Sequence, residues 1–264
     1  MYGHYQNKTI VITGASSGIG KALVMELASI ECTLFIGARS VDKLELLKQE
    51  LTGQPAEVIP FHMDLSEGAS LEKAVLELQR HTKHIDVLIN NAGISQRGYA
   101  AETEFEVVER IMNTNYRGTV LFTSRCNGLL NQAADPQIIV NISVVGEYGF
   151  PLRSAYAASK HALKGYFQSY QLEPNAHKIS LVFAGGVQTN ISKNALNAKG
   201  EPNNKAETRI DKGVTAEETA SRILKGSAKY KKNIFIGWRE VLLLYISRYS
   251  PMLYRKIARN VNAE

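Results

Sequence analysis

The segment SAYAASKHAL places Tyr156 and Lys160 four residues apart among small side chains. In a helix this spacing puts both side chains on one face, so the phenol and the ammonium can point into one cleft. A phenol with an ordinary pKa of about 10 is a poor acid or base at neutral pH, and a nearby cation favours its ionised form. Ser143, at the end of a predicted strand, can hydrogen-bond a substrate oxygen. Taken alone, a Tyr and Lys pair is most often an ordinary helix face, but with Ser143 and the turn described next it predicts proton transfer.

A glycine-rich turn, TGASSGIGKAL, follows the first predicted strand. Glycine allows a sharp turn, a close approach of backbone N–H groups to a pyrophosphate and close packing of the next helix. The first turn of that helix adds its positive dipole end. Because a strand precedes the turn and a helix follows it, we expect a dinucleotide site. The expected contacts are Gly14, Ser16, Ser17, Gly18, Ile19 and Gly20.

The end of the second predicted strand, FIGARS, bears on which dinucleotide binds. Sites that prefer NAD usually place Asp or Glu there, against the ribose 2′-hydroxyl. This sequence has Arg39 and Ser40 and no carboxylate, and an arginine can clamp a 2′-phosphate with two hydrogen bonds. The sequence therefore predicts NADP(H) as the cofactor. The alternative is that Arg39 is a solvated loop residue.

Short apolar runs that alternate with helical patterns define the fold class. The helical patterns cover residues 21–29, 42–51 and 71–80, and continuous apolar strands between helices indicate a parallel sheet covered on both faces. We therefore predict an α/β fold, a doubly wound parallel seven-stranded sheet of the Rossmann type, in one domain over residues 1–264. The predicted strands are 8–13, 32–37, 57–61, 85–89, 137–142, 179–183 and 233–236.

Composition and charge limit the classes of partner that we expect for this protein. Hydrophobic residues make up 44% and charged residues 21%, as in an ordinary packed globule. The basic excess lies in residues 221–264, with ten Lys and Arg and two Glu, and no nucleic-acid motif accompanies it. Cys32, Cys126, His81 and His84 lack metal-ligand spacing, so no metal site is expected. No signal peptide or membrane span is evident, and we expect a soluble cytoplasmic protein; a peripheral contact with a membrane is the alternative.

Two segments stand apart from the strand and helix pattern. Residues 190–215 are polar and follow the sixth strand at the ligand-binding edge, which predicts a lid over the site; the alternative is a surface insertion. The tail over 233–260 is basic and amphipathic. It could pack on the body, cap the substrate pocket, form a subunit contact or lie on a lipid surface.

Together, TGASSGIG (13–20), NNAG (90–93), Asn115, Ser143 and the Tyr156 and Lys160 pair resemble the short-chain dehydrogenase/reductase superfamily over residues 8–190. The resemblance implies a catalytic tetrad of Asn115, Ser143, Tyr156 and Lys160. It also implies that Lys160 binds the nicotinamide ribose and that Asn115 anchors a water that relays protons to Lys160. Further cofactor contacts implied by the family are Asp64 and Leu65 after the third strand, Asn91, Ala92 and Gly93 after the fourth, and Val187 and Thr189 after the sixth.

Residues 145–170 and 189–196 are similar to the branch that holds the 11β-hydroxysteroid dehydrogenases and microsomal dehydrogenase/reductases. That branch implies NADP(H) and a lipophilic alcohol or carbonyl substrate. One departure is Ala184 before Gly185, where the family usually has proline. Many relatives also carry an N-terminal membrane anchor, whereas this chain starts almost at its first strand. The family's subunit interface implies a homodimer or homotetramer built on the helices 103–130 and 154–173.

The sequence thus predicts an NADP(H)-dependent oxidoreductase that interconverts a hydroxyl and a carbonyl on a lipophilic small molecule by hydride transfer. The alternative of another class is a non-catalytic NADP(H)-binding regulatory or scaffold protein. The presence of Ser143, Tyr156 and Lys160 together argues against that alternative. Sugar-nucleotide epimerase chemistry fits less well, because that branch generally has a different glycine spacing and a longer C-terminal domain.

Overall fold

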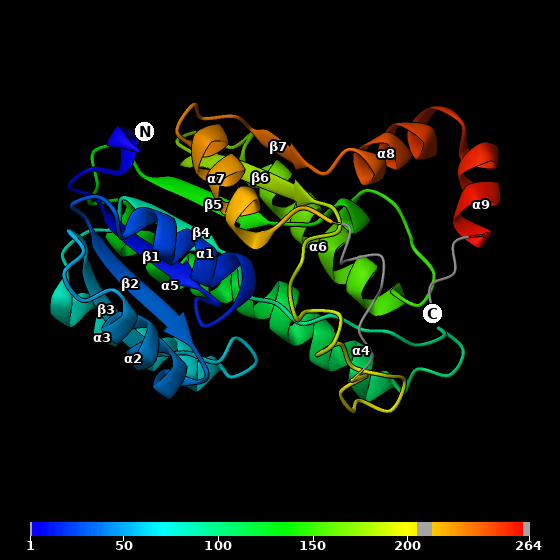
Figure 1. The fold of residues 1–264 in the computed structure, drawn as a ribbon, viewed down its shortest axis with the longest axis horizontal. Coiled ribbons are helices and arrows are strands. Elements are labelled where there is room, and N and C mark those ends of the chain that lie inside the picture. Colours follow the sequence, from blue (N-terminus) through cyan, green and yellow to red (C-terminus); the bar gives the residue numbers. More distant parts are fainter. Residues whose placement is uncertain (1, 205–212, 261–264) are drawn as a thin grey trace.

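A computed structural model describes residues 2–204 and 213–260 as one seven-stranded sheet between two helical layers (Figure 1). Every strand pair is parallel, and the order is β3-β2-β1-β4-β5-β6-β7. The strands are β1 (Thr9–Thr13), β2 (Thr33–Ala38), β3 (Glu57–His62), β4 (Val87–Asn90), β5 (Gln137–Asn141), β6 (Lys178–Ala184) and β7 (Asn233–Ile236). The predicted fold class is confirmed.

The order of the strands reverses at the middle of the sheet. β1 pairs with β2 on one side and with β4 on the other, so the chain runs outward to β3 and then crosses back. In open parallel sheets this reversal leaves a crevice beyond the carboxyl ends of the central strands. The residues that follow β1, β4 and β5 therefore meet at one edge.

Two layers of helices bury both faces of the sheet, which explains why β1 is apolar and buried along its whole length. One layer holds α1 (Gly18–Leu27), α2 (Val41–Glu50) and α7 (Ala216–Ser227). The other holds α3 (Gly68–His81), α4 (Phe105–Met112), α5 (Thr119–Leu130) and α6 (Ser154–Tyr170). Short 3₁₀ turns lie at Gly3–Tyr5 and Val144–Gly146.

Three segments differ from the sequence-based expectation. The helix predicted over 103–130 is α4 and α5 joined by a π-helical turn, Asn113–Gly118. The C-terminal tail contains β7 and then two helices, α8 (Arg239–Tyr249) and α9 (Pro251–Arg259), because proline at the first position of α9 cannot continue α8. Residues 190–204 have no helix or long strand, but Leu196 forms bridges with Gln96 and Pro202. Part of the predicted lid, 205–212, lies outside the described residues.

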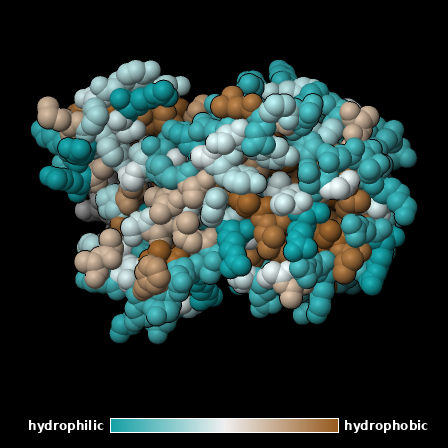
Figure 2. Space-filling model, turned by 180° about the vertical axis from the view of Figure 1, so that it is seen from behind, coloured by the Kyte–Doolittle hydropathy of each residue, from teal (hydrophilic) through white to brown (hydrophobic). Residues whose placement is uncertain are grey.

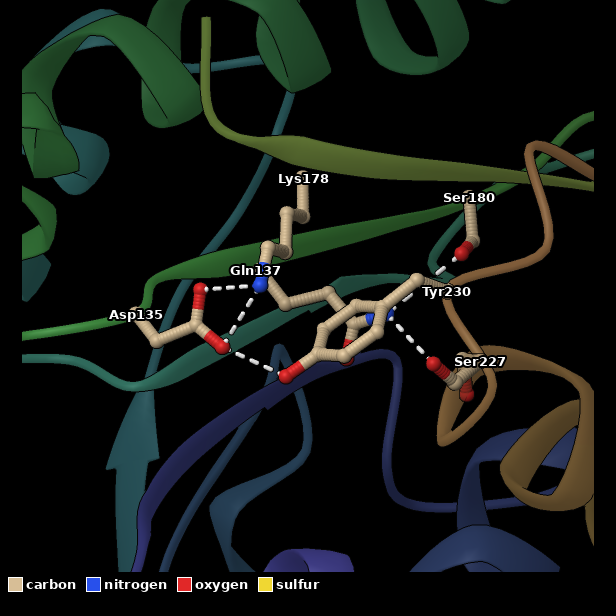
Figure 3. A network of polar contacts seen from close by, with 6 residues as sticks. All are labelled: Asp135, Gln137, Lys178, Ser180, Ser227 and Tyr230. Atoms are coloured by element: carbon tan, nitrogen blue, oxygen red, sulfur yellow. Dashed lines mark hydrogen bonds and ion pairs between the residues drawn. The ribbon is translucent and has the colours of Figure 1, made fainter.

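A network of polar side chains ties the amino ends of β5 and β6 to the turn after α7 (Figure 3). Lys178 Nζ lies 2.7 Å from Asp135 Oδ1, and the Tyr230 hydroxyl donates to Asp135 Oδ2 at 2.5 Å. The buried Gln137 amide donates to the Ser227 carbonyl at 2.8 Å. This network lies at the edge of the sheet opposite to the expected site.

The layer formed by α3, α5 and α6 faces the viewer in Figure 2, where hydrophobic side chains gather to the right of the middle, between hydrophilic ones. A groove between α5 and α6 is lined by residues that include Tyr116, Asn127, Tyr166 and Tyr170. Among the residues that the structure describes, no helix is both long enough and apolar enough to cross a bilayer.

Candidate active site

The glycine turn after β1 is shaped by contacts that leave no room for side chains. Gly14 has φ +68°, and a Cβ there would lie 2.7 Å from the Ala92 Cα. A Cβ on Gly20 would lie 2.1 Å from the Gly14 carbonyl oxygen. Gly18 has φ +53° and begins α1, whose N-cap residue Ser17 makes no side-chain capping bond. The turn therefore presents backbone N–H groups and a helix N-terminus at the carboxyl edge of the sheet.

The NNAG segment after β4 packs directly on this turn. The Thr13 hydroxyl accepts hydrogen bonds from the backbone N–H groups of Asn91 and Ala92, each at 3.0 Å. The Asn91 amide donates to the Thr13 carbonyl oxygen at 3.1 Å, and its oxygen accepts from the Asn141 amide at 3.2 Å. The ends of β1, β4 and β5 are thus joined by side chains, which fixes the floor of the crevice.

Asn115 and Lys160 converge on Gly93. A Cβ on Gly93 would lie 3.1 Å from Asn115 Oδ1 and 3.6 Å from Lys160 Nζ. Asn115 is fully buried, exchanges hydrogen bonds with the backbone of Ile94 at 2.8 and 2.9 Å, and donates to Ser159 Oγ at 3.0 Å. It lies in the π-helical turn, a distortion that is frequent at functional sites.

Lys160 is a buried cation. Its ammonium donates to the Asn141 carbonyl oxygen at 2.7 Å, which uses one of its three donors, and lies 5.9 Å from the centre of the Tyr156 ring. Burial lowers the pKa of Lys160 to about 8. A buried ammonium with a lowered pKa, at the carboxyl edge of the sheet, is a candidate for a functional site.

Tyr156 lies one helical turn before Lys160, as the spacing predicted, and its side chain is buried. Burial raises the pKa of the Tyr156 phenol, while the positive charge of Arg153 and a hydrogen bond with the Ser143 side chain lower it. The phenol thus has a hydrogen-bond partner and a cation beside it, the two features that favour ionisation of a buried tyrosine.

Ser143 lies two residues beyond β5, in an unusual backbone conformation. Its φ is +89° and its ψ is 150°, a region that a residue with a Cβ seldom adopts. Its N–H donates to the Val182 carbonyl oxygen at 3.1 Å, and its own carbonyl accepts from Gly146 at 3.0 Å. Such strained conformations cluster at active sites, where the surrounding contacts hold them. Here the conformation accompanies the hydrogen bond between Ser143 and Tyr156.

The residues expected to bind the adenosine half lie beyond β2 and β3. Arg39 and Ser40 are exposed directly after β2. Asp64 Oδ1 accepts from the Ser66 N–H at 2.8 Å and from the Ser66 hydroxyl at 2.7 Å, so the carboxylate is oriented by the turn. Leu65 is buried. All four residues lie on the same sheet edge as the glycine turn.

The turn after β6 carries the last predicted contacts. Thr189 packs on the glycine turn, since a Cβ on Gly18 would lie 3.1 Å from its methyl carbon, and Val187 is buried and bridges Val214. Glu240 of α8 occupies the space beside Gly185: its carboxylate oxygen would lie 2.9 Å from a Cβ there. The sequence gives no sign of this contact, because the two residues are far apart along the chain.

Two further residues of the site were not predicted. Gln96 is fully buried, and its side-chain oxygen accepts from the Ala155 N–H at 2.9 Å, which satisfies a free donor in the first turn of α6. Arg153 donates to Ser95 Oγ at 2.5 Å and to Ser192 Oγ at 3.3 Å, and so joins the loop after β4 to the segment 190–204. The sequence signal for Arg153 was its position, as a cation three residues before Tyr156.

The site fits a dinucleotide by its shape and by its donors. A cradle free of side chains lies at the N-terminus of α1, and at the far end of the crevice the Lys160 ammonium lies near Gly93. Among the described residues, no cluster of His, Cys, Asp or Glu could hold a metal ion. His161, next to Lys160, hydrogen-bonds the Ala157 carbonyl oxygen at 2.9 Å on its own helix.

Comparisons with known proteins agree with this geometry. The model of the short chain dehydrogenase family matches residues 8–200. A dehydrogenase/reductase SDR family protein 7-like of Anopheles gambiae is 35% identical over 242 residues, which cover 89% of this chain and 76% of that protein. The family match over residues 8–200 includes the glycine turn, the NNAG segment and the helix α6.

Solved structures show the same fold with nucleotides bound. An alcohol dehydrogenase of Thermococcus sibiricus complexed with 5-hydroxy-NADP has a TM-score of 0.77 and 25% identity, over 89% of this chain and 98% of that one. A short chain dehydrogenase/reductase of Burkholderia phymatum in complex with NAD has a TM-score of 0.83 and 22% identity, over 95% and 96% of the two chains. The sequence match and the seven-stranded sheet lead to one conclusion: this chain belongs to the short-chain dehydrogenase family of oxidoreductases.

Proposed function

We propose that the protein is an NADP(H)-dependent oxidoreductase that interconverts a hydroxyl and a carbonyl on a lipophilic small molecule. The observation that carries the proposal is the convergence of a buried tyrosine, its serine partner and a buried lysine beside a cradle suited to a dinucleotide. A bound nicotinamide would supply or accept the hydride. The protein's own side chains must then hold the substrate oxygen and move its proton.

Tyr156 is the proposed acid and base. In reduction its hydroxyl gives a proton to the oxygen of the substrate carbonyl, and in oxidation the phenolate takes that proton back. Ser143, within hydrogen-bond reach of Tyr156, donates to the same oxygen and orients the substrate. The charge of Arg153 favours the phenolate and keeps proton transfer closer to neutral pH.

Lys160 and Asn115 complete the proposed tetrad. Lys160 holds the nicotinamide ribose with its ammonium, which already donates to the Asn141 carbonyl at the end of β5. Asn115 lies close to Gly93 and Lys160 and anchors the water through which protons reach Lys160. Its burial and its three hydrogen bonds support a positioning role for this residue.

Arg39 is proposed to select NADP(H) through the 2′-phosphate. Its exposure directly after the carboxyl end of β2, with the exposed Ser40 as its neighbour and no carboxylate at either position, supports this role. The remaining proposed contacts are the glycine turn with Ser16, Ser17 and Ile19, then Asp64, Leu65, Asn91, Ala92, Gly93, Val187 and Thr189.

The proposed lipophilic substrate would bind beside the loop that follows Ser143. Val145 and Phe150 of this loop pack against the hydrophobic core, and Tyr148 is buried. Leu152 precedes α6 with φ +61°. The segment 190–204, held to Ser95 and Arg153, is proposed to border this pocket as part of a lid. The groove between α5 and α6 is proposed as the contact in a homodimer or homotetramer.

One experiment tests cofactor choice and chemistry together. Thermal-shift titrations with NADPH and with NADH are run on the wild-type protein and on Arg39→Asp, because a ligand that binds only the folded state raises its stability. Turnover of lipophilic carbonyls with NADPH is then compared with that of Tyr156→Phe. We expect NADPH to stabilise the wild type more than NADH does, Arg39→Asp to lose that preference, and Tyr156→Phe to bind NADPH without turnover. If the wild type binds NADPH but turns over none of the carbonyls tested, the scaffold alternative is favoured.

A further inference from the structure

The two C-terminal helices expose several large apolar side chains to solvent. Figure 1 shows α8 and α9, orange to red, projecting from the end of the sheet beside β7. Trp238 is 72% exposed, Tyr249 is 78% exposed and Met252 is 82% exposed. Leu242, Tyr245 and Leu253 are also exposed. No comparable run of large apolar side chains is exposed on α1 to α7 within the described ranges.

These side chains form a stripe along α8. Trp238, Leu242, Tyr245 and Tyr249 are spaced by four, three and four residues, which places them on one face of a helix. The Leu242 N–H donates to the Trp238 carbonyl at 2.9 Å, so the helical path includes Trp238. Three of the four have amphipathic rings, the type that is enriched where an apolar phase meets water.

The opposite faces of both helices are fastened to the body. Leu244 of α8 and Ala258 of α9 are buried. The Tyr148 hydroxyl donates to the Glu240 carbonyl oxygen at 3.3 Å, and the Tyr254 hydroxyl donates to the Gly149 carbonyl oxygen. The inward faces of both helices already pack on the body. The exposed stripe is therefore a separate, outward face.

The charges around the stripe have one sign. Residues 237–260 carry five cations, Arg239, Arg248, Arg255, Lys256 and Arg259, and one carboxylate, Glu240. That carboxylate is directed toward Gly185 and Gly237 in the body. On α9 the exposed Met252, Lys256 and Arg259 follow helical spacing, so apolar and cationic side chains share one face.

We propose that α8 and α9 dock on an anionic lipid surface, with the Trp238 to Tyr249 stripe entering the interface and the surrounding cations facing the headgroups. Aromatic and aliphatic side chains bordered by Lys and Arg are the pattern of helices that lie in such an interface. A second copy of this chain fits less well, because a two-fold contact would bring the two basic patches against each other. The inference does not depend on the proposed reaction.

Trp238 makes the test direct, because it is the single tryptophan of the chain. Its emission is recorded with vesicles of phosphatidylcholine alone and of phosphatidylcholine mixed with phosphatidylserine, at low and high salt, and co-sedimentation is measured in parallel. We expect a blue shift and co-sedimentation with the anionic vesicles only, both reduced by salt. Absence of both signals at low salt overturns the proposal, and so does a blue shift without vesicles that accompanies dimer formation in sedimentation.

Variants distinguish the contribution of the apolar stripe to vesicle binding from that of the cations. Replacing two cations, Arg255→Gln with Lys256→Gln, removes about 1 kcal/mol per charge and should weaken vesicle binding roughly 25-fold. Leu242→Ser with Tyr245→Ser should abolish the blue shift. The matched control is Leu172→Ser, which changes a leucine that is 83% exposed outside these helices and should leave binding unchanged. Equal binding by all these variants would refute the proposed surface, and circular dichroism verifies that each is folded.

Discussion

Replacing the buried Lys160 by methionine should make the protein more stable at pH 7. Burial lowers the pKa of this lysine from the ordinary 10.5 to about 8. Each pKa unit corresponds to about 1.4 kcal/mol, so keeping the ammonium charged at pH 7 costs the fold about 3 kcal/mol. Methionine has a similar length and no charge, but it leaves the Asn141 carbonyl without its hydrogen bond from Lys160. This loss lowers the stability by about 1–2 kcal/mol. The net expectation is a gain of about 1–2 kcal/mol for Lys160→Met.

The gain should depend on pH. Between pH 8 and 10.5 the unfolded chain holds a proton on this lysine that the folded protein has lost, so the wild type becomes more stable as the pH rises. Urea unfolding without added nucleotide, at pH 7 and near pH 10, measures this. The advantage of Lys160→Met should shrink by about 2 kcal/mol between the two values.

The control for this prediction is Lys164→Met, on the same helix and paired with Glu147 at 2.7 Å. This substitution removes a partly exposed lysine of the same helix together with its ion pair, so it should destabilise the protein at pH 7 rather than stabilise it. If Lys160→Met is less stable than the wild type at pH 7 and shows the same pH dependence, the ammonium is not held at a cost, and the reasoning fails.

Three further predictions follow from the site and its surroundings. Gly14→Ala puts a methyl group into the chain after β4 at a φ of +68°, so it should lower stability by about 1–2 kcal/mol and abolish the thermal shift with NADPH. Arg153→Gln removes a charge that lowers the pKa of Tyr156, so the rising limb of the pH profile for alcohol oxidation should move to higher pH, whereas an unchanged profile would exclude this role. Tyr230→Phe removes a partly exposed bond to Asp135 and should cost less than about 1 kcal/mol in urea unfolding, with turnover unchanged.

The strands and the helix that carries Tyr156 and Lys160 could be predicted because their signals are local. Each strand is a short apolar run, and the Tyr156 to Lys160 spacing specifies one helix face whatever surrounds it. The glycine turn could be predicted for the same reason, since a strand and a helix flank it directly. All seven predicted strands are present, with boundaries that shift by at most two residues.

The unpredicted features depend on contacts between distant segments. The π-helical turn around Asn115 adds one residue to a helical turn without changing the apolar pattern enough to be seen in the sequence. The bridge between Gln96 and Leu196 joins two segments without periodicity, so nothing local predicts it. The packing of Glu240 against Gly185 likewise requires knowing that α8 returns to the end of β6.

The network of Asp135, Lys178 and Tyr230 has a practical consequence for attaching the protein to a support. It lies at the amino ends of the strands, and the proposed active site lies at the carboxyl ends, so a tether placed beside the network would leave the proposed site open to solution. Lys231 is exposed in the adjoining turn. Because Cys32 and Cys126 are both buried, a cysteine introduced at Lys231 would provide a single reactive thiol and one fixed orientation.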